Sequence, residues 1–327
     1  MQAAAGKDAL RGGIDLGGTK IQAAIVSPTG EVSGEARRQT PTEGGPADVA
    51  AEMAKALVEA ADAAGVQTDS LAGVGVGSPG DTNEETGDVS EARNLPDWEG
   101  SFPLGPTLAN ALGAQVRIGN DVDVATNAEF KLGAGKPYDS ILGVFWGTGV
   151  GGGLILDGKR WTGRGAAGEI GHMVVKDGGR HCPCGRRGCM EAYAGRGAME
   201  HRARKLHDEG TKTKLFEIME ERGRDRLTSG IWERALHHHD DLAKELIGEA
   251  LEALGAGVAS AVNLLDIEAV IIGGGLGVRF GEKYVQRIAT RMHPHLFVPD
   301  RPPVMHVAQL GDLGGAIGAA LLSKETP

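Results

Sequence analysis

The stretch RGGIDLGGTKIQAAIVS, residues 11–27, decides the fold class of this chain. It consists of two apolar runs, 11–16 and 20–27, joined by a glycine-rich turn, and this pattern predicts a β-hairpin. Within it, DLGGTK brings a carboxylate, two glycines, a hydroxyl and an ammonium to one turn. Because glycine has no side chain, the backbone N–H groups of such a turn can approach phosphate oxygens. The spacing is not that of a Walker A loop, and on this motif alone a plain β-turn is an equally good interpretation.

The same arrangement occurs again in the second half of the chain. An apolar run at 140–146 is followed by GTGVGGG (147–153) and by a further strand pattern at 153–156. A third glycine turn, GGGLG (273–277), follows an apolar strand, but Val278 stands where a dinucleotide-binding fingerprint needs its third glycine. Three glycine turns on separate strands favour a split nucleotide site. The duplicated hairpin and the alternating strands and helices predict an α/β protein with two lobes and a cleft between them.

Other segments fit this α/β pattern. Residues 80–100 are predicted to be a loop, and residues 160–190 are irregular. The spacing of apolar residues predicts helices at 46–64, 103–112, 121–132 and 312–322, and strands at 30–39, 71–77, 115–119, 268–272 and 303–308.

Composition excludes several classes of partner. The 327-residue chain has a net charge of −10, 4% aromatic residues and no basic run, which argues against nucleic acid or an anionic membrane. ATP stays possible, because backbone amides and Mg²⁺ hold phosphates without a basic surface. No apolar run approaches the roughly 20 residues that span a bilayer, and the N-terminal residues lack a signal-peptide pattern. We therefore expect a cytoplasmic protein.

Asp121, in the segment GNDVDVATNAEF, is the candidate general base. It stands at the N-terminal edge of the helix predicted at 121–132, where the helix dipole is expected to keep its carboxylate ionised. A helix N-cap is an equally common role for an aspartate at this position, so the residues alone leave both open. Asp123 is the rival base, and we expect it to be a solvated acid of the first helical turn.

The three cysteines of the chain, Cys182, Cys184 and Cys189, lie too close together for a disulfide framework and are typical of a metal cluster. With His172 they complete the Cys₃His set of a closed, structural zinc site, and His181 is a possible competing ligand. Such a metal would order Glu169 and Glu191, which flank the cluster, and His172 could ligate through one ring nitrogen and contact a bound substrate through the other. The run HHH at 237–239 is interpreted as a solvated helix start.

The ordered set DLGGTK, GVGSPG, GNDVDVATNAE, GTGVGGG, GEIGH, CPCGRRGCMEAYAG and VIIGGG resembles the ROK family (repressors, open reading frames, sugar kinases) of the hexokinase–actin-like superfamily. The resemblance covers residues 11–322, and within the family it points to the ATP-dependent bacterial glucokinases. It implies two RNase H-like lobes, a small one of residues 1–119 plus 311–327 and a large one of residues 120–310 that carries the zinc segment 172–189. The implied reaction is phosphorylation of a hexose, with glucose as the expected substrate, by ATP with Mg²⁺.

The resemblance also implies roles for single residues. It favours Asp121 as the base. The DLGGTK turn by itself indicates that Asp15 could hold Mg²⁺ through water, because hard cations prefer oxygen ligands. Contacts to the nucleotide are implied for Asp15, Gly17, Gly18, Thr19, Lys20, Thr148 and Gly149 at the phosphates, and for Gly274 and Gly275 near the adenosine. Contacts to the sugar are implied for Gly80, Asn94, Asn120, Asp121, Glu169, His172 and Glu191.

Alternatives remain within this family. The sugar could be mannose, fructose or N-acetylglucosamine, because one hydroxyl's orientation depends on details of pocket shape. Polyphosphate could replace ATP, although the chain has no Lys/Arg-rich signal for a polyanion. A ROK-type repressor is disfavoured, because the first strand starts near residue 11 and leaves no room for a DNA-binding domain. The family's habit suggests a homodimer.

Overall fold

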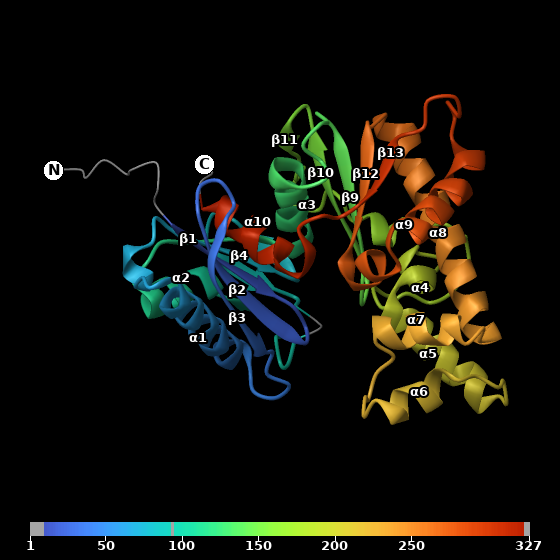
Figure 1. Cartoon of the computed structure of the whole chain (residues 1–327), viewed down its shortest axis with the longest axis horizontal. Helices are drawn as coiled ribbons and strands as arrows, with labels where there is room; N and C mark the ends of the chain where they lie inside the picture. Colours follow the sequence, from blue (N-terminus) through green and yellow to red (C-terminus); the bar gives the residue numbers. More distant parts are fainter. Residues whose placement is uncertain (1–9, 93–94, 324–327) are drawn as a thin grey trace. The chain divides into compact units, whose positions relative to one another are not determined.

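The computed structural model describes residues 10–92 and 95–323 and divides the chain into two compact units (Figure 1). The first unit is formed by the described residues within 1–136, 162–167 and 309–327, and the second by residues 137–161 and 168–308. The sequence predicts a lobe boundary at residue 120, whereas the first unit extends to residue 136. The reason is that helix α3 (Asp121–Leu132) packs against helix α10 (Gly314–Leu322) of the same unit.

The first unit is built on a five-stranded mixed sheet with the order β3-β2-β1-β4-β8. The β1–β2 and β2–β3 pairs are antiparallel, and the β1–β4 and β4–β8 pairs are parallel. The predicted hairpin is the β1–β2 pair, in which Arg11 lies opposite Val26. Its strands are β1 (Arg11–Leu16), β2 (Lys20–Val26), β3 (Val32–Gln39), β4 (Val74–Ser78) and β8 (Val116–Asn120).

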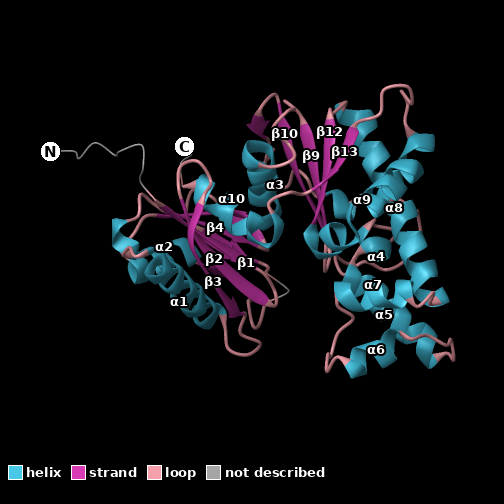
Figure 2. Cartoon of the chain, viewed as in Figure 1, coloured by secondary structure: helices cyan, strands magenta, loops and turns pink. Residues whose placement is uncertain are grey.

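Helices cover both faces of this sheet (Figure 2). Helices α1 (Pro46–Ala64) and α2 (Leu104–Leu112) bury one face around Ile14, Ile21 and Leu57. Helix α10 packs directly on the other face, because Gly75 of β4 has no side chain: a Cβ there would overlap the carbonyl oxygen of Ala319. Helix α10 therefore lies directly against the backbone of β4.

Two predicted helices of the first unit have the predicted bounds, and a predicted loop has more structure than expected. Helix α1 starts with Pro46 after Gly45 and ends at the left-handed Gly65, and α3 covers 121–132. The predicted loop 80–100 instead contains two strands of a small antiparallel sheet, because short polar strands lack the apolar alternation that marks a strand. This sheet consists of β5 (Asp81–Asn83), β6 (Asp88–Ser90) and β7 (Ser101–Phe102).

The second unit has its own five-stranded mixed sheet, with the order β11-β10-β9-β12-β13. Antiparallel pairs join β9 to β10 and β10 to β11, and parallel pairs join β12 to β9 and to β13. Its strands are β9 (Ile141–Trp146), β10 (Val150–Leu156), β11 (Lys159–Arg160), β12 (Ala269–Gly273) and β13 (Val304–Val307). Since β10 begins at Val150, the second half of GTGVGGG is strand, whereas the sequence predicts a turn.

Helices make up most of the rest of the second unit (Figure 1). Helix α9 packs on β9, β12 and β13, and α8 packs on α9. These helices are α4 (Glu191–Ala194), α5 (Arg196–Asp208), α6 (Leu215–Glu221), α7 (Ser229–His237), α8 (Asp241–Leu265) and α9 (Gly274–Met292). Short 3₁₀ turns occur in both units, at Thr68–Ser70, Ile170–His172, His293–His295 and Gly311–Leu313.

Two local predictions in this unit are wrong. GGGLG is not a turn: Gly273 is the N-cap of α9, and the helix starts at Gly274. The three histidines at 237–239 are exposed as predicted, but they end helix α7 and do not start a helix. The next helix, α8, has Asp240 as its N-cap, and the Asp240 side chain accepts a hydrogen bond from the N–H of Ala243. Within the described ranges, none of the helices is both long and apolar enough to cross a membrane.

Candidate active site

Asp15 lies near the end of β1, on the sheet face that α10 covers. Its register partners are Gln22 on β2 and Gly77 on β4. A Cβ on Gly315, in the first turn of α10, would lie 2.5 Å from the carboxylate carbon of Asp15. The N-terminal end of α10 therefore approaches this carboxylate, and the positive end of the helix dipole favours its charged form.

The turn that follows β1 is held in a defined conformation. The N–H of Gly17 donates to the carbonyl oxygen of Lys20 at 2.9 Å, and Thr40 Oγ1 donates to the carbonyl oxygen of Gly17 at 2.6 Å. Lys20 Nζ lies 3.3 Å from Asp312 Oδ1, and Thr19 is exposed. The predicted phosphate turn is thus an ordered hairpin that presents one hydroxyl and one ammonium.

Asn120, and not Asp121, caps helix α3. Asn120 Oδ1 accepts hydrogen bonds from the N–H groups of Val122 at 3.0 Å and Asp123 at 3.2 Å. Asp121 Oδ1 accepts a further bond of 2.9 Å from the N–H of Val122. The capping role that the sequence leaves open for Asp121 is therefore filled by its neighbour.

Asp121 and Asp15 are both neighbours of Gly77. Gly77 is the register partner of Asp15, and a Cβ on Gly77 would lie 3.3 Å from Cα of Asp121. Burial raises the pKa of Asp121 to about 7, and the charges of Asp15 and Asp123 add to this effect against the hydrogen bond from Val122. Burial likewise raises the pKa of Asp15 to about 6, while Lys20 lowers it and Asp312 raises it.

The pKa of Asp121 and the burial of Asp123 correct two predictions about α3. The helix dipole predicts an ionised, weakly basic Asp121, but burial and a second carboxylate outweigh the dipole and place its pKa where a general base is most useful. Asp123 is predicted to be solvated, yet only 9% of it is exposed. The first turn of α3 faces the protein and not the solvent.

Two further residues of the first unit are predicted to contact the sugar, and one of them lies in the described part of the chain. Gly80 follows β4 with φ of +91°, and a Cβ there would lie 2.5 Å from the carbonyl oxygen of Ser90. Only glycine fits this turn, which carries the chain from β4 into the small sheet. Asn94 falls outside the described residues.

In the second unit, two of the glycine segments come together. The turn between β9 and β10 contains Thr148 and Gly149, and a Cβ on Gly147 would lie 3.8 Å from the backbone nitrogen of Gly275. Gly274 has a φ of +77° and packs on the carbonyl of Trp146. The 147–149 turn and the N-terminal end of α9 are therefore adjacent, as a shared nucleotide site requires.

The predicted metal ligands also come together. One ligand atom from each of His172, Cys182, Cys184 and Cys189 can be chosen so that all four lie within 4.8 Å of one another. His172 Nδ1 lies 3.8 Å from Cys182 Sγ, and Cys184 Sγ lies 3.7 Å from Cys189 Sγ. His181 is exposed, and its Nδ1 lies 3.1 Å from the carbonyl oxygen of Cys182. The donor set of one imidazole and three thiols fits Zn²⁺.

Both flanking glutamates are in contact with this cluster. Glu191 Oε1 lies 3.9 Å from Cys182 Sγ, while Glu191 Oε2 accepts a hydrogen bond of 2.9 Å from the N–H of Val150. Glu169 Oε2 lies 3.9 Å from His172 Nε2, the ring nitrogen on the far side from the cysteines. The two nitrogens of His172 thus have different neighbours.

Comparison with known proteins identifies the family. The sequence profile of the ROK family matches residues 11–326. This chain belongs to the ROK family. It is 33% identical over 324 residues to a glucokinase of Thermotoga maritima, with 96% of each chain covered. It is 31% identical to an N-acetylgalactosamine kinase of a Shewanella species, with 95% of each chain covered.

Among solved structures, the fold of this ROK protein is similar to that of a ROK glucokinase from Streptomyces griseus in complex with glucose and AMPPNP. The TM-score is 0.83 and the identity 30%, and the match covers 97% of this chain and 100% of the other. The predicted fold class, with an α/β sheet in each half, is confirmed.

The structure of this ROK protein adds two residues that the sequence does not single out. Gln22 is 4% exposed, and its Oε1 has no hydrogen-bond partner in the described part of the chain. Arg196 donates to Thr148 Oγ1 at 2.8 Å. Neither belongs to a spacing pattern, and only the strand register and the start of α5 bring them to the site. A single Gln or Arg in a sequence carries no such signal.

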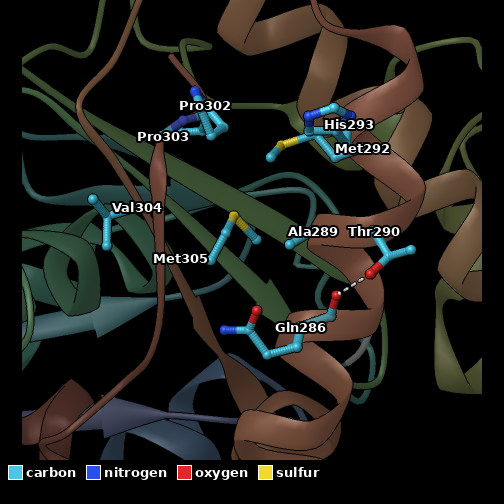
Figure 3. A pocket seen from close by; sticks show the side chains of 9 residues that line it. All are labelled: Gln286, Ala289, Thr290, Met292, His293, Pro302, Pro303, Val304 and Met305. Carbon is cyan, nitrogen blue, oxygen red and sulfur yellow. Dashed lines mark hydrogen bonds between the residues drawn. The ribbon is translucent and has the colours of Figure 1, made fainter. Parts of the chain in front are cut away.

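A cavity of about 490 Å³ lies elsewhere in the second unit of this ROK protein, between α9 and β13 (Figure 3). It is lined by Gln286, Ala289, Thr290, Met292, His293, Pro302, Pro303, Val304 and Met305. None of the predicted site residues lines it, and its walls bring no pair of carboxylates together. This cavity therefore contains none of the candidate site residues.

Proposed function

We propose that this ROK protein is an ATP-dependent hexose kinase and that glucose is its substrate, with glucose 6-phosphate and ADP as products. The observation that carries the proposal is Asp121, a carboxylate beside Asp15 whose pKa is raised to about 7 and which is not needed as a helix cap. The glucokinases among the relatives, and the bound glucose and AMPPNP of the Streptomyces griseus protein, support the choice of substrates.

In the proposed reaction, the 6-hydroxyl oxygen of the sugar attacks the γ-phosphorus of ATP. The new O–P bond forms as the bond from the γ-phosphorus to the bridging oxygen breaks, and ADP leaves with that electron pair. The hydroxyl proton passes to the Asp121 carboxylate. A base with a pKa near the working pH suits this step, because it is ionised before the transfer and basic enough to accept the proton.

The surroundings of Asp15 in the first unit fit a hydrated Mg²⁺ ion. The buried Oε1 of Gln22 has no partner among the described residues, and it lies on the same sheet face as the Asp15 carboxylate because the two residues are register partners. A hydrated cation offers O–H donors to such an oxygen. Asp15 would hold the ion through water, and Mg²⁺ would neutralise charge on the phosphates. Lys20 and Thr19 would bind phosphate oxygens directly.

In the second unit, we propose that Thr148 and Gly149 bind phosphates and that Gly274 and Gly275 lie near the adenosine. In the first unit, we propose that Asn120 and Asp121 bind sugar hydroxyls. In the second unit, Glu169, His172 and Glu191 are the residues proposed for this role. Gly80 and Asn94 would border the sugar. A zinc ion on His172 and the three cysteines would be structural, because four protein ligands leave no open position for water. It would hold Glu169 and Glu191 in place.

The identity of the sugar and of the phosphate donor is the most specific part of the proposal. Relatives of nearly equal identity include kinases of N-acetylated hexosamines, so an N-acetylhexosamine or mannose is the main alternative acceptor. A further relative of known structure, 25% identical, is named a polyphosphate/ATP-glucomannokinase, so the donor needs its own test. A homodimer and a cytoplasmic location also stay predictions.

ADP release from the purified protein tests this proposal. We would supply ATP with glucose, mannose, fructose, N-acetylglucosamine, N-acetylgalactosamine or N-acetylmannosamine in turn, and then measure glucose 6-phosphate with polyphosphate in place of ATP. The expected result is the highest kcat/KM with glucose and no product from polyphosphate. Sugar-independent or absent ADP release would contradict a kinase function. A preference for a hexosamine would contradict only the choice of glucose.

A further inference from the structure

Arg196 connects helix α5 to the 147–149 turn. Its guanidinium donates through one terminal nitrogen to Thr148 Oγ1 at 2.8 Å, and through the other to the carbonyl oxygen of Leu227 at 3.0 Å. The backbone is connected too: the N–H of Arg196 donates to Gly147 O at 3.1 Å, and the N–H of Gly197 donates to Thr148 O at 3.0 Å. The first residues of α5 therefore hold both carbonyl groups and the hydroxyl of the turn.

This contact keeps the Thr148 hydroxyl hydrogen pointed away from Arg196. A guanidinium has five N–H donors and no acceptor, so Thr148 Oγ1 accepts from Arg196. The hydroxyl hydrogen must then point to a different partner. A phosphate oxygen accepts hydrogen bonds only, so Arg196 prepares the threonine for this class of ligand.

The charge of Arg196 is the second observation. Burial lowers the pKa of Arg196, against the charge of Glu200, while the charge of Arg226 adds to the lowering. Glu200 is engaged elsewhere, since its Oε1 pairs with Arg204 and its Oε2 accepts from the N–H of Leu227. Across the described residues, no carboxylate forms an ion pair with Arg196. A half-buried cation in this position is stabilised by an anionic ligand.

We propose that Arg196 is a positioning residue for the phosphates of the nucleotide. It holds the Thr148 hydroxyl as a donor to a phosphate oxygen and supplies positive charge at the 147–149 turn. The ligand class is a nucleoside di- or triphosphate. The inference rests on the proposed kinase function and adds to it a residue outside the glycine motifs.

A double-mutant cycle tests the inference. We would measure the Kd of ADP and of glucose by calorimetry for wild type, Arg196→Met, Thr148→Val and the double variant, with the unfolding temperature of each. Arg196→Met should weaken ADP binding about 10-fold or more and leave the Kd of glucose within about 2-fold, because a charged hydrogen bond is lost at the phosphates alone. If the two single variants acted independently, their fold-losses of ADP affinity would multiply. The loss in the double variant should be smaller than that product by at least about 3-fold, because Arg196 acts through Thr148.

Two conservative variants separate positioning from packing. Arg196→Lys keeps the charge and should bind ADP more tightly than Arg196→Met. Thr148→Ser keeps the hydroxyl and should bind ADP more tightly than Thr148→Val. Unchanged ADP affinity in Arg196→Met, or equal losses for ADP and glucose with a lower unfolding temperature, would overturn the inference. If wild type binds glucose but no adenine nucleotide, the ATP-dependent function fails. If wild type binds both and Arg196→Met matches it, only the role of Arg196 fails.

Discussion

Glu191 Oε2 accepts a hydrogen bond of 2.9 Å from the N–H of Val150, the first residue of β10. The other oxygen of the same carboxylate lies 3.9 Å from Cys182 Sγ. One side chain thus links the metal-ligand cluster to the strand that leaves the 147–149 turn. In the proposed kinase this glutamate also binds the sugar, so the order of the cluster determines how well a substrate-binding carboxylate is placed.

Cys184→Ser should damage sugar binding more than nucleotide binding. Loss of one thiolate removes the metal, and metal-binding free energy is also local folding free energy. We expect a rise of about 10-fold or more in the Kd of glucose, a smaller rise for ATP through the Glu191–Val150 bond, and a lower unfolding temperature. Calorimetric titrations with glucose and an ATP analogue measure this. A variant that has lost its metal but binds glucose as wild type does would refute a structural role for zinc.

Elemental analysis tests the ligand set directly. Purified wild type should contain about one zinc per chain, because the donor set is that of a closed tetrahedral site. His172→Ala should lose most of the zinc. His181→Ala is the matched control and should keep it, since the four clustered ligands do not include His181. Zinc-free wild type that is folded and active, or zinc retention in His172→Ala with loss in His181→Ala, would show that the ligands are wrongly assigned.

The metal cluster shows what a sequence pattern can predict. Three cysteines within eight residues and one histidine leave few arrangements, so the four ligands are predicted correctly as neighbours. The contact of Arg196 with Thr148 has no such signal, because 48 residues separate them and a lone arginine is usually a surface residue. The cap of α3 lies between these two cases. The sequence shows that the cap is Asn120 or Asp121, since both residue types are good caps, but only the structure shows that it is Asn120.

Gly75→Ala should destabilise the first unit. The new methyl group would overlap the carbonyl oxygen of Ala319 and push α10 away from the sheet, at a cost of about 2–3 kcal/mol of unfolding free energy. Gly248→Ala is the control, because its Cβ would meet no atom within 4 Å and lies inside α8, where alanine stabilises a helix by up to about 1 kcal/mol. Urea unfolding of both variants gives the comparison. Equal stability of the two would contradict the close packing of α10 on β4.

Asp15→Asn should stabilise the protein at pH 8 in the absence of Mg²⁺. The pKa of Asp15 is raised to about 6 in the folded state, from about 4 when unfolded, so its contribution to stability is present below pH 4 and is lost as pH rises through 6. The asparagine does not ionise. We expect the asparagine to raise the unfolding free energy by at least about 1 kcal/mol at pH 8, a figure reduced to allow for the partial exposure of Asp15. The gain should become smaller as pH falls toward 4.

Asp312→Asn serves as the control for this change, because the Asp312 side chain is 76% exposed and should alter stability little at any pH. Thermal unfolding between pH 4 and pH 8 in a chelating buffer measures both variants. A lower stability of Asp15→Asn at pH 8 would mean that the Asp15 carboxylate is stabilised in its ionised form, opposite to the raised pKa.

The central claim is that Asp121 accepts the proton of the sugar hydroxyl, and Asp121→Asn tests it most directly. The amide keeps the size of the side chain, and Asn120 still caps α3, so folding and glucose affinity should be preserved. Asp123→Asn, the same change two residues on, tests the rival base. The measurement is single-turnover formation of glucose 6-phosphate at saturating ATP and glucose. Asp121→Asn should lose at least about 10²-fold in rate with a Kd of glucose near that of wild type. A rate within a few-fold of wild type for Asp121→Asn, with the large loss in Asp123→Asn instead, would contradict the claim.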